Sequence, residues 1–239
     1  MPFPGEIEWY LKYASKQDPI LELACGSGRI TLPLAEAGFK IHAVDRSQTM
    51  LNRLQEKLTK YPLRTGRRIV TICDDMATFS PAKSYSLIIL PYNSLQYLET
   101  KEHVRTFFMH VFSELISNGY FLFVVKRWNS AEFTQGERII DWMDKPLTMP
   151  ETKVTVGSKL KFTLDDERRQ IINTREYRIA YPDGKTQNIR QVSCSPIIET
   201  KEYIEMLDKA RFNTQSFSDY DEILDDGKSR EMCCVCRKK

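Results

Sequence analysis

Two glycines and two carboxylates near the N-terminus have the types and spacing needed to hold a nucleoside. Gly26 and Gly28 lie in a tight turn after an apolar run, where a side chain would crowd a ligand or forbid positive backbone angles. Glu22 precedes that turn, where a carboxylate can reach a cationic amino group. Asp45 follows 17 residues after Gly28, where it can accept hydrogen bonds from both hydroxyls of a ribose. These four residues predict a site for a nucleoside-containing cofactor.

A dinucleotide-binding dehydrogenase uses a similar turn, but its pattern differs from this one at two places. Its fingerprint has a third glycine three residues after the second, and Thr31 occupies that place here. It also has no need for Glu22. The segment Glu22–Gly28 instead resembles the first motif of class I S-adenosylmethionine-dependent methyltransferases, E-x-A-C-G-x-G. The resemblance implies S-adenosylmethionine as the cofactor, with Glu22 near its amino end and Asp45 on its ribose. The competing interpretation is a glycine turn in an ordinary α/β protein.

Later segments extend this resemblance to the rest of the family's cofactor site. Residues Asp45–Leu51 resemble the family's D-x-S-x-x-M-L segment, and Lys209–Phe212 resembles K-A-G-F with arginine in place of the glycine. Asp75 and Met76 match the pair that receives the adenine in the family, through a carboxylate on the exocyclic amine and a backbone amide on a ring nitrogen. Asp74 is expected to be a solvated neighbour. The cofactor-binding residues implied by the resemblance are Glu22, Ala24, Cys25, Gly26, Gly28, Asp45, Arg46, Met50, Asp75, Met76 and Leu90.

The segment Pro91–Leu98 resembles the N-S-x-x-H-L loop of small-molecule methyltransferases, which faces the transferred methyl group and the substrate. Tyr97 stands where many relatives have a histidine. Because a tyrosine has a pKa of about 10, it is a poor general base at neutral pH. We expect Tyr97 to pack against the cofactor or to orient a substrate, and Arg127 to clamp a carboxylate or phosphate or to form a surface ion pair. The candidates for a catalytic role are Tyr97, Asn93 and Tyr92, and those for substrate contact are Tyr97, Arg127 and Trp128.

The elements that must position these residues alternate between strands and helices, which is typical of an α/β fold. Apolar runs predict buried strands at 20–24, 40–44, 68–73, 85–90, 120–126, 212–217 and 232–236. Helices are predicted at about 30–38, 47–58, 101–117, 130–143 and 199–209. In the second of these, Ser47 is expected to be the cap and the buried face is expected to carry Met50, Leu51, Leu54 and Leu58. We predict a Rossmann-like, seven-stranded, mostly parallel sheet with helices on both faces.

The pattern changes after the fifth predicted strand. Residues 153–164, 170–180 and 186–194 alternate or carry β-branched side chains, which predicts an antiparallel β insertion of about three strands. The expected domains are therefore a cofactor-binding core at 1–150, the insertion at 151–198, and a helix with strands at 199–239 that completes the core sheet. The insertion is expected to cover a substrate or to form a homodimer contact.

Composition excludes several classes of protein. The 35 basic and 32 acidic residues are spread along the chain, which is no electrostatic footprint for nucleic acid. Without an apolar stretch of about 18 residues or a secretory signal, we expect no membrane partner and a cytoplasmic location. The six cysteines lack zinc-site spacing, so we expect free buried thiols and no metal. The first helix is expected by about Pro4, so an N-terminal lid is short, supplied elsewhere or absent from this sequence.

These observations predict a methyltransferase that uses S-adenosylmethionine, releases S-adenosylhomocysteine and methylates an amine or hydroxyl of a small molecule. An amine acceptor is favoured, because a neutral amine needs no strong base. One alternative is a non-catalytic S-adenosylmethionine-binding or scaffold protein that has kept the turn. Another is a nucleic-acid or protein methyltransferase, which requires a basic or extended groove around the insertion.

Overall fold

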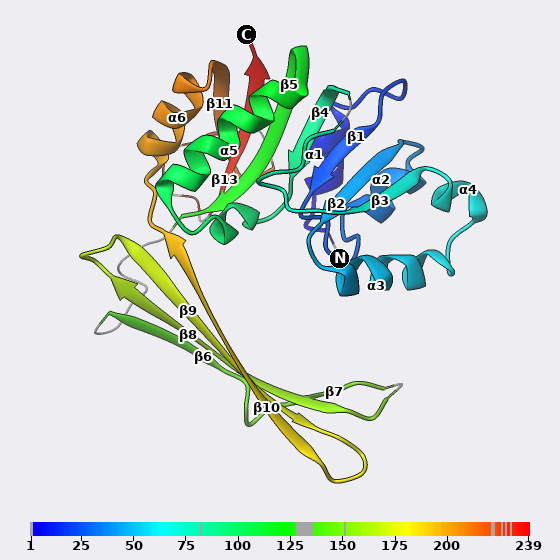
Figure 1. The fold of residues 1–239 in the computed structure, drawn as a ribbon, viewed down its shortest axis with the longest axis vertical. Coiled ribbons are helices and arrows are strands. Elements are labelled where there is room, and N and C mark those ends of the chain that lie inside the picture. Colours follow the sequence, from blue (N-terminus) through cyan, green and yellow to red (C-terminus); the bar gives the residue numbers. More distant parts are fainter. Residues whose placement is uncertain are drawn as a thin grey trace. The chain divides into compact units, whose positions relative to one another are not determined.

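The computed structural model describes residues 2–81, 83–127, 136–150, 152–220, 223–225, 227, 229 and 231–239. The chain falls into two compact units (Figure 1). The first contains Met1–Leu95, Glu102–Arg127 and Ile198–Lys239, and the second contains Gln96–Lys101 and Trp128–Ile197. The second unit is therefore formed by two separate segments of the chain, the short one at Gln96–Lys101 and the longer one at Trp128–Ile197.

The first unit is built on one mixed sheet in the order β12-β11-β13-β5-β4-β1-β2-β3. Its strands are β1 (Ile20–Leu23), β2 (Ile41–Asp45), β3 (Ile69–Cys73), β4 (Tyr85–Leu90), β5 (Leu115–Lys126), β11 (Phe212–Ser218), β12 (Ile223–Leu224) and β13 (Glu231–Lys238). Strands β5, β4, β1, β2 and β3 are parallel, whereas β13 is antiparallel to β5 and β11 is antiparallel to β13. The α/β class is confirmed. In the described part of the chain this sheet has eight strands rather than the predicted seven, because the two-residue β12 pairs with the end of β11.

Helices cover both faces of this sheet (Figure 1). They are α1 (Glu6–Leu11), α2 (Thr31–Glu36), α3 (Gln48–Leu58), α4 (Leu63–Gly66), α5 (Lys101–Glu114) and α6 (Thr200–Lys209). Because neighbouring strand residues point to opposite faces, Leu122 and Val124 of β5 join one core with side chains of α1, α2 and α3. Phe123, which lies between them, packs instead against Phe108 of α5 and Tyr203 of α6. None of the helices in the described part of the chain is long and apolar enough to cross a membrane.

Local signals set the ends of α3 and α6. Ser47 is the cap of α3, and its Oγ accepts a hydrogen bond from the Met50 N–H at 3.3 Å, as predicted. Leu51 and Leu54 are buried, but Met50 is 39% exposed, so its predicted place on the buried face is wrong. The helical period places Met50 on the same side as Leu54, four residues later, but Met50 lies in the first turn of α3 and is exposed there. After α6, Arg211 has a left-handed φ of 67°, the conformation that the family's glycine adopts easily.

Strand β5 begins earlier than the sequence predicted. Helix α5 ends at Glu114 and the strand begins at Leu115, so the expected helix to 117 and strand from 120 are both displaced. Asn118, which lies between the predicted helix and the predicted strand, is inside β5 and has a φ of 62°. The register with β4 shifts between Tyr85 and Leu87, so Asn118 accompanies an irregularity in the ladder.

The second unit contains an antiparallel sheet in the order β10-β9-β8-β6, with β7 also paired to β8. Its strands are β6 (Glu137–Asp141), β7 (Leu147–Thr148), β8 (Thr155–Asp165), β9 (Gln170–Ala180) and β10 (Thr186–Pro196). The last three match the three predicted strands. The helix predicted at 130–143 is wrong where it can be compared, because 137–141 are β6, and 130–135 lie outside the described residues. Because β6 and β7 pair with β8, this sheet begins before residue 151, where we expected the insertion to start.

Candidate functional site

The turn between β1 and α2 uses backbone angles that glycine adopts readily. Gly26 has a φ of 55° and Gly28 a φ of 82°. A Cβ at Gly28 would lie 2.3 Å from Cδ1 of Leu54, so a side chain here would displace that methyl group of α3. A Cβ at Gly26 would meet no atom within 4 Å. The backbone at Gly26 therefore borders open space and forms a cradle that a side chain would fill.

Asp45 is held beside this cradle by two backbone amides. Its Oδ2 accepts a hydrogen bond from the Gly26 N–H at 2.7 Å, and its Oδ1 accepts one from the Ser47 N–H at 2.8 Å. Strands β1 and β2 are parallel neighbours, so their carboxyl ends bring Asp45 and the turn together. A carboxylate offers about four lone-pair positions, so Asp45 keeps acceptor capacity for further hydroxyl groups. This arrangement fits a ribose lying against the turn.

Glu22 is buried inside β1, with 1% of its surface exposed. Its Oε2 accepts a hydrogen bond from the Thr31 hydroxyl at 2.7 Å. Burial raises the pKa of Glu22 to about 8, although the Thr31 hydrogen bond and the charge of Arg29 lower it. Thr31 therefore has a structural reason to replace the third glycine of the dehydrogenase pattern, because a glycine has no hydroxyl to donate to Glu22.

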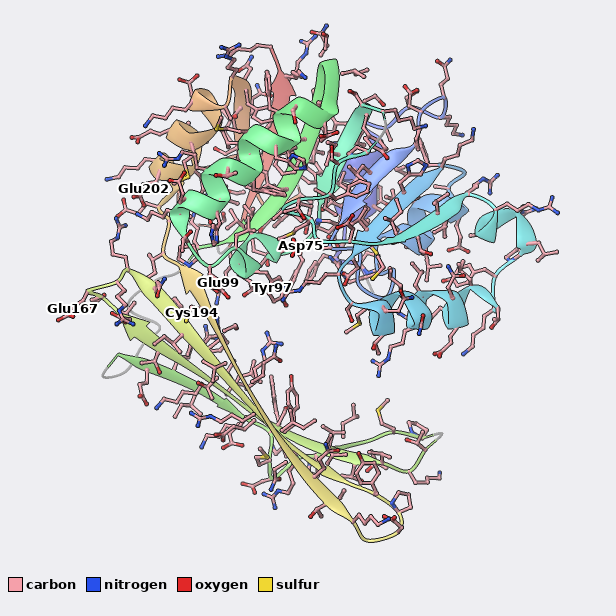
Figure 2. The ribbon with its side chains drawn as sticks, viewed as in Figure 1. Asp75, Tyr97, Glu99, Glu167, Cys194 and Glu202 are labelled. Carbon is pink, nitrogen blue, oxygen red and sulfur yellow. The ribbon has the colours of Figure 1, made fainter. Side chains whose placement is uncertain are left out.

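Asp75 and Met76, predicted to receive the adenine, follow β3 in a tight turn. Asp75 is labelled in Figure 2. Its Oδ1 accepts a hydrogen bond from the Ala77 N–H at 2.9 Å, and its backbone carbonyl accepts one from the Phe79 N–H at 2.8 Å. These bonds fix the direction of the carboxylate while leaving it acceptor capacity. Met76 is 9% exposed, whereas Asp74 is exposed, as expected of a solvated neighbour.

The other predicted cofactor residues differ in their exposure. Arg46 and Met50 are exposed at the start of α3, and Ala24 is half-buried with a φ of 54°. Leu90, the last residue of β4, is fully buried. Cys25 is also buried, and burial raises the pKa of its thiol, so it stays protonated and is a poor nucleophile.

The cysteines are free, as predicted. Cys25, Cys233, Cys234 and Cys236 are buried, whereas Cys73 is exposed and Cys194 is half-buried. Within the described ranges, no group of histidine, cysteine, aspartate or glutamate side chains is arranged to hold a metal ion.

The segment predicted to face the acceptor begins in the first unit. Tyr92 follows β4 with a left-handed φ of 57°, and 49% of its surface is exposed. Asn93 is nearly buried, and its Oδ1 accepts a hydrogen bond from the Lys126 N–H at 3.0 Å. This hydrogen bond links the carboxyl ends of β4 and β5, so Asn93 has a structural role in addition to the predicted catalytic one.

Tyr97 belongs to the second unit, where Figure 2 labels it with Glu99 and Cys194. It ends a short 3-10 helix, η1 (Ser94–Tyr97), and is 45% exposed. The backbone on either side is tied to the antiparallel sheet: the Ser195 hydroxyl donates to the Gln96 carbonyl at 3.0 Å, and the Gln170 amide donates to the Glu99 carbonyl at 3.3 Å. The predicted loop is thus divided between the two units, which its sequence did not indicate.

Arg127 is not a surface arginine, and the role we predicted for it as a substrate clamp is not supported. Its Nη1 donates to the Ser229 hydroxyl at 2.6 Å and to the Glu231 carbonyl at 3.1 Å, and its Nε donates to Thr200 at 3.2 Å. Its Nη2 pairs with Asp225, whose side chain is 4% exposed. The guanidinium ties the end of β5 to the C-terminal part of the chain. Trp128, the other substrate candidate near this point, lies outside the described residues.

A cluster of side chains near the N-terminus was not predicted from the sequence. The carboxylate of Glu6 is fully buried and pairs with both Nη atoms of Arg29, the residue after Gly28. Phe3 stacks on Tyr92 with ring centroids 5.9 Å apart. The partners of the ion pair are 23 residues apart, and no local pattern links them.

The fold and the turn together define a nucleoside-binding α/β domain, with its carboxylates at the carboxyl ends of adjacent parallel strands. Residues 20–119, which contain Glu22, Gly26, Asp45 and Asp75, match the family model described as a methyltransferase domain. This segment of the chain is therefore similar to a methyltransferase domain, the class that the turn at Glu22–Gly28 indicated.

Known proteins are similar to this chain in sequence over about half of its length, or in fold. The putative methyltransferase YqeM of Bacillus subtilis (strain 168) is 31% identical over 125 residues, which are 52% of this chain and 49% of that protein. The chain thus spans about half the length of this curated relative. A crystal structure of an S-adenosylmethionine-dependent methyltransferase from Clostridium acetobutylicum ATCC 824 matches with a TM-score of 0.80 at 15% identity, covering 100% of this chain and 92% of that one. The sugar N-methyltransferase KedS8 from Streptoalloteichus sp ATCC 53650 matches with a TM-score of 0.76 at 18% identity, covering 100% and 88%. These two likenesses concern the fold.

Proposed function

We propose that this protein transfers a methyl group from S-adenosylmethionine to an amine of a small molecule. The observation that carries the proposal is the anchoring of Asp45 on the Gly26 amide, beside open space at the glycine turn. Glu22 supplies a second carboxylate at the same turn, and Asp75 a third at the end of β3.

The residues at the turn fit the cofactor, and each has a defined task. Asp45 accepts hydrogen bonds from the ribose hydroxyls, and Asp75 with the amide of Met76 receives the adenine. Glu22 serves the amino-acid end, where a nearby cation favours its ionised form. When bound, S-adenosylmethionine supplies a methyl group attached to a positively charged sulfur. The protein's contribution to such a transfer is alignment of the acceptor and exclusion of water.

An amine acceptor is favoured over a hydroxyl because the acceptor segment offers no strong base. Tyr97 replaces the family's histidine, and a tyrosine with a pKa of about 10 stays protonated at neutral pH. A neutral amine attacks without prior deprotonation, whereas an alcohol needs a base. The fold shared with a sugar N-methyltransferase supports this choice.

Calorimetry and a paired acceptor panel test the proposal. S-adenosylhomocysteine should bind the wild type, and Asp45→Asn should weaken binding by at least about tenfold, the loss expected for one charge-assisted hydrogen bond. Asp74→Asn, a change of the same type at the exposed neighbour, should leave binding unchanged. Turnover should occur with small amines such as amino sugars and not with matched sugars that carry a hydroxyl instead. Binding without any turnover would favour the non-catalytic alternative, and no binding would refute the proposal.

The antiparallel sheet of the second unit is the part we propose for substrate cover and for a homodimer contact. Strand β10 is an edge strand of 11 residues, and most of its length is exposed. An edge of this length presents unpaired backbone groups that a second copy can match by antiparallel pairing. Ile189 and Val192 of this strand are 41% and 55% exposed, which adds apolar surface to the edge.

A further inference from the structure

Four side chains around the N-terminus form a cluster that we call the aromatic clasp: Phe3, Glu6, Arg29 and Tyr92. The Arg29 guanidinium lies 5.4 Å from the ring centroid of Phe3 and 5.7 Å from that of Tyr92, and the two rings stack 5.9 Å apart. Each of the three groups therefore contacts the other two. Cation–aromatic and stacked aromatic contacts of this kind are both attractive.

Buried ion pairing fixes the cation of the clasp. Glu6 is fully buried and accepts hydrogen bonds from both Nη atoms of Arg29, one of them at 2.9 Å. Glu6 also accepts a hydrogen bond from the Phe3 N–H at 2.9 Å, which holds the N-terminal segment against the guanidinium. Phe3 is further backed by the Tyr220 ring at 6.4 Å. A two-point Arg–carboxylate contact in a buried setting sets the orientation of the guanidinium as well as its position.

Tyr92 has an unfavourable backbone conformation. Its φ of 57° is left-handed, which is strained for a residue with a bulky side chain. Such a conformation persists only where the surroundings impose it, and the described contacts of the Tyr92 ring are those with Phe3 and Arg29. The clasp therefore opposes the relaxation of Tyr92 to an ordinary conformation.

The clasp connects two parts of the site that lie on different strands. Arg29 directly follows Gly28 in the cofactor turn after β1, whereas Tyr92 follows the carboxyl end of β4 by two residues. Strands β1 and β4 are parallel neighbours, so both segments leave the sheet at the same edge. Side chains in direct contact therefore link the turn to Tyr92.

We propose that Phe3, Glu6 and Arg29 are positioning residues that couple the cofactor turn to Tyr92, so that cofactor binding at the turn orders the acceptor segment. This inference rests on the proposed function, because it takes the turn to be the cofactor site. Its consequence is ordered binding: the acceptor meets a fixed Tyr92 ring only after the cofactor is in place. The coupling works through loss of motion and requires no large displacement.

Hydrogen exchange with S-adenosylhomocysteine as the probe tests the coupling without any acceptor. In the wild type, the ligand should slow exchange by about tenfold in peptides covering 2–8 and 91–95 as well as in the turn itself. In Phe3→Ala the ligand should still bind within about threefold of wild type, but the slowing at 91–95 should be lost. Phe3 is 43% exposed, so this variant leaves the core intact. Arg237→Met is the matched control, because it removes a guanidinium that lies 6.0 Å from the Tyr120 ring elsewhere in the same unit.

Each outcome of these experiments either supports or overturns the proposed coupling. The double variant Glu6→Gln with Arg29→Met removes the buried pair without leaving one charge unpaired, and it should lose the slowing at 91–95 as Phe3→Ala does. Full slowing at 91–95 in both variants, or ligand binding to the wild type with no slowing there, would overturn the coupling and leave the proposed function standing. Failure of the wild type to bind S-adenosylhomocysteine would overturn the proposed function and the coupling with it.

Discussion

Replacing Glu22 by glutamine should stabilise the protein, and the gain should grow with pH. Glu22 is buried and receives one hydrogen bond from Thr31. Glutamine has nearly the shape of the protonated glutamic acid, and its amide oxygen can accept the same hydrogen bond. The substitution therefore removes an ionisable group from an apolar setting without creating a cavity.

The size of the effect follows from the pKa of Glu22, which burial raises from 4.5 to about 8. Below pH 4.5 the carboxyl is protonated in the folded and the unfolded chain, so it imposes no pH-dependent cost. Between pH 4.5 and 8 the unfolded chain loses the proton first, and the free energy of unfolding falls by up to about 1.4 kcal/mol per pH unit. Above pH 8 the cost is constant, at most about 5 kcal/mol.

Thermal unfolding of Glu22→Gln and wild type at pH 5, 6, 7 and 8 measures this cost. The difference in unfolding free energy should widen by about 3 kcal/mol from pH 5 to pH 8, or roughly 10 °C in Tm for a chain of this size. Glu36→Gln, at an exposed position of α2, is the matched control and should show no such trend. A Tm difference that stays constant from pH 5 to pH 8 would show that Glu22 is ionised throughout, and the reasoning would be refuted.

Two further predictions separate packing from binding and test the proposed dimer. Gly28→Ala should cost about 2 kcal/mol of stability, because its Cβ meets Leu54 and its φ is strained. Gly26→Ala should cost about 1 kcal/mol of stability but should weaken S-adenosylhomocysteine binding by at least about tenfold, because its Cβ enters the open space at the turn. If denaturant melts and calorimetry showed equal effects for the two variants, the assignment of Gly28 to packing and Gly26 to binding would be wrong. Light scattering should show a homodimer that Ile189→Lys dissociates and Leu63→Lys, on α4, does not; a wild-type monomer would exclude the contact.

The cofactor turn could be predicted from the sequence because its signals are local. An apolar strand, two glycines with positive φ and an acidic residue at the end of the next strand all lie within 26 residues. Each follows from backbone sterics or from the register of parallel strands. Ser47 was found for the same reason, because a helix cap depends on the residue itself and on the amides that follow it.

The remaining parts of the site depend on contacts that no local pattern encodes. Arg127 was predicted to face a ligand, but its partners lie 73 to 104 residues away. The pairing of Glu6 with Arg29 joins helix α1 to the turn that follows the next element, β1. Tyr97 could be recognised as a substitution for histidine, yet its attachment to the second unit through Gln96 and Ser195 was not visible. The sequence pattern could predict which residues were candidates, but their roles depend on contacts with residues far away in the sequence.

Glu22 shows why a binding residue and a stable fold make opposite demands. The folded chain favours its neutral form, because burial outweighs the hydrogen bond from Thr31 and the charge of Arg29. A cationic group bound at the turn favours the ionised form, so binding must lower the pKa of Glu22 and release a proton near neutral pH. The same carboxylate that destabilises the free protein at pH 8 is then stabilised in the complex. Glu22→Gln should therefore bind S-adenosylhomocysteine more weakly than wild type while unfolding at a higher temperature, a combination expected of a residue retained for binding rather than for stability.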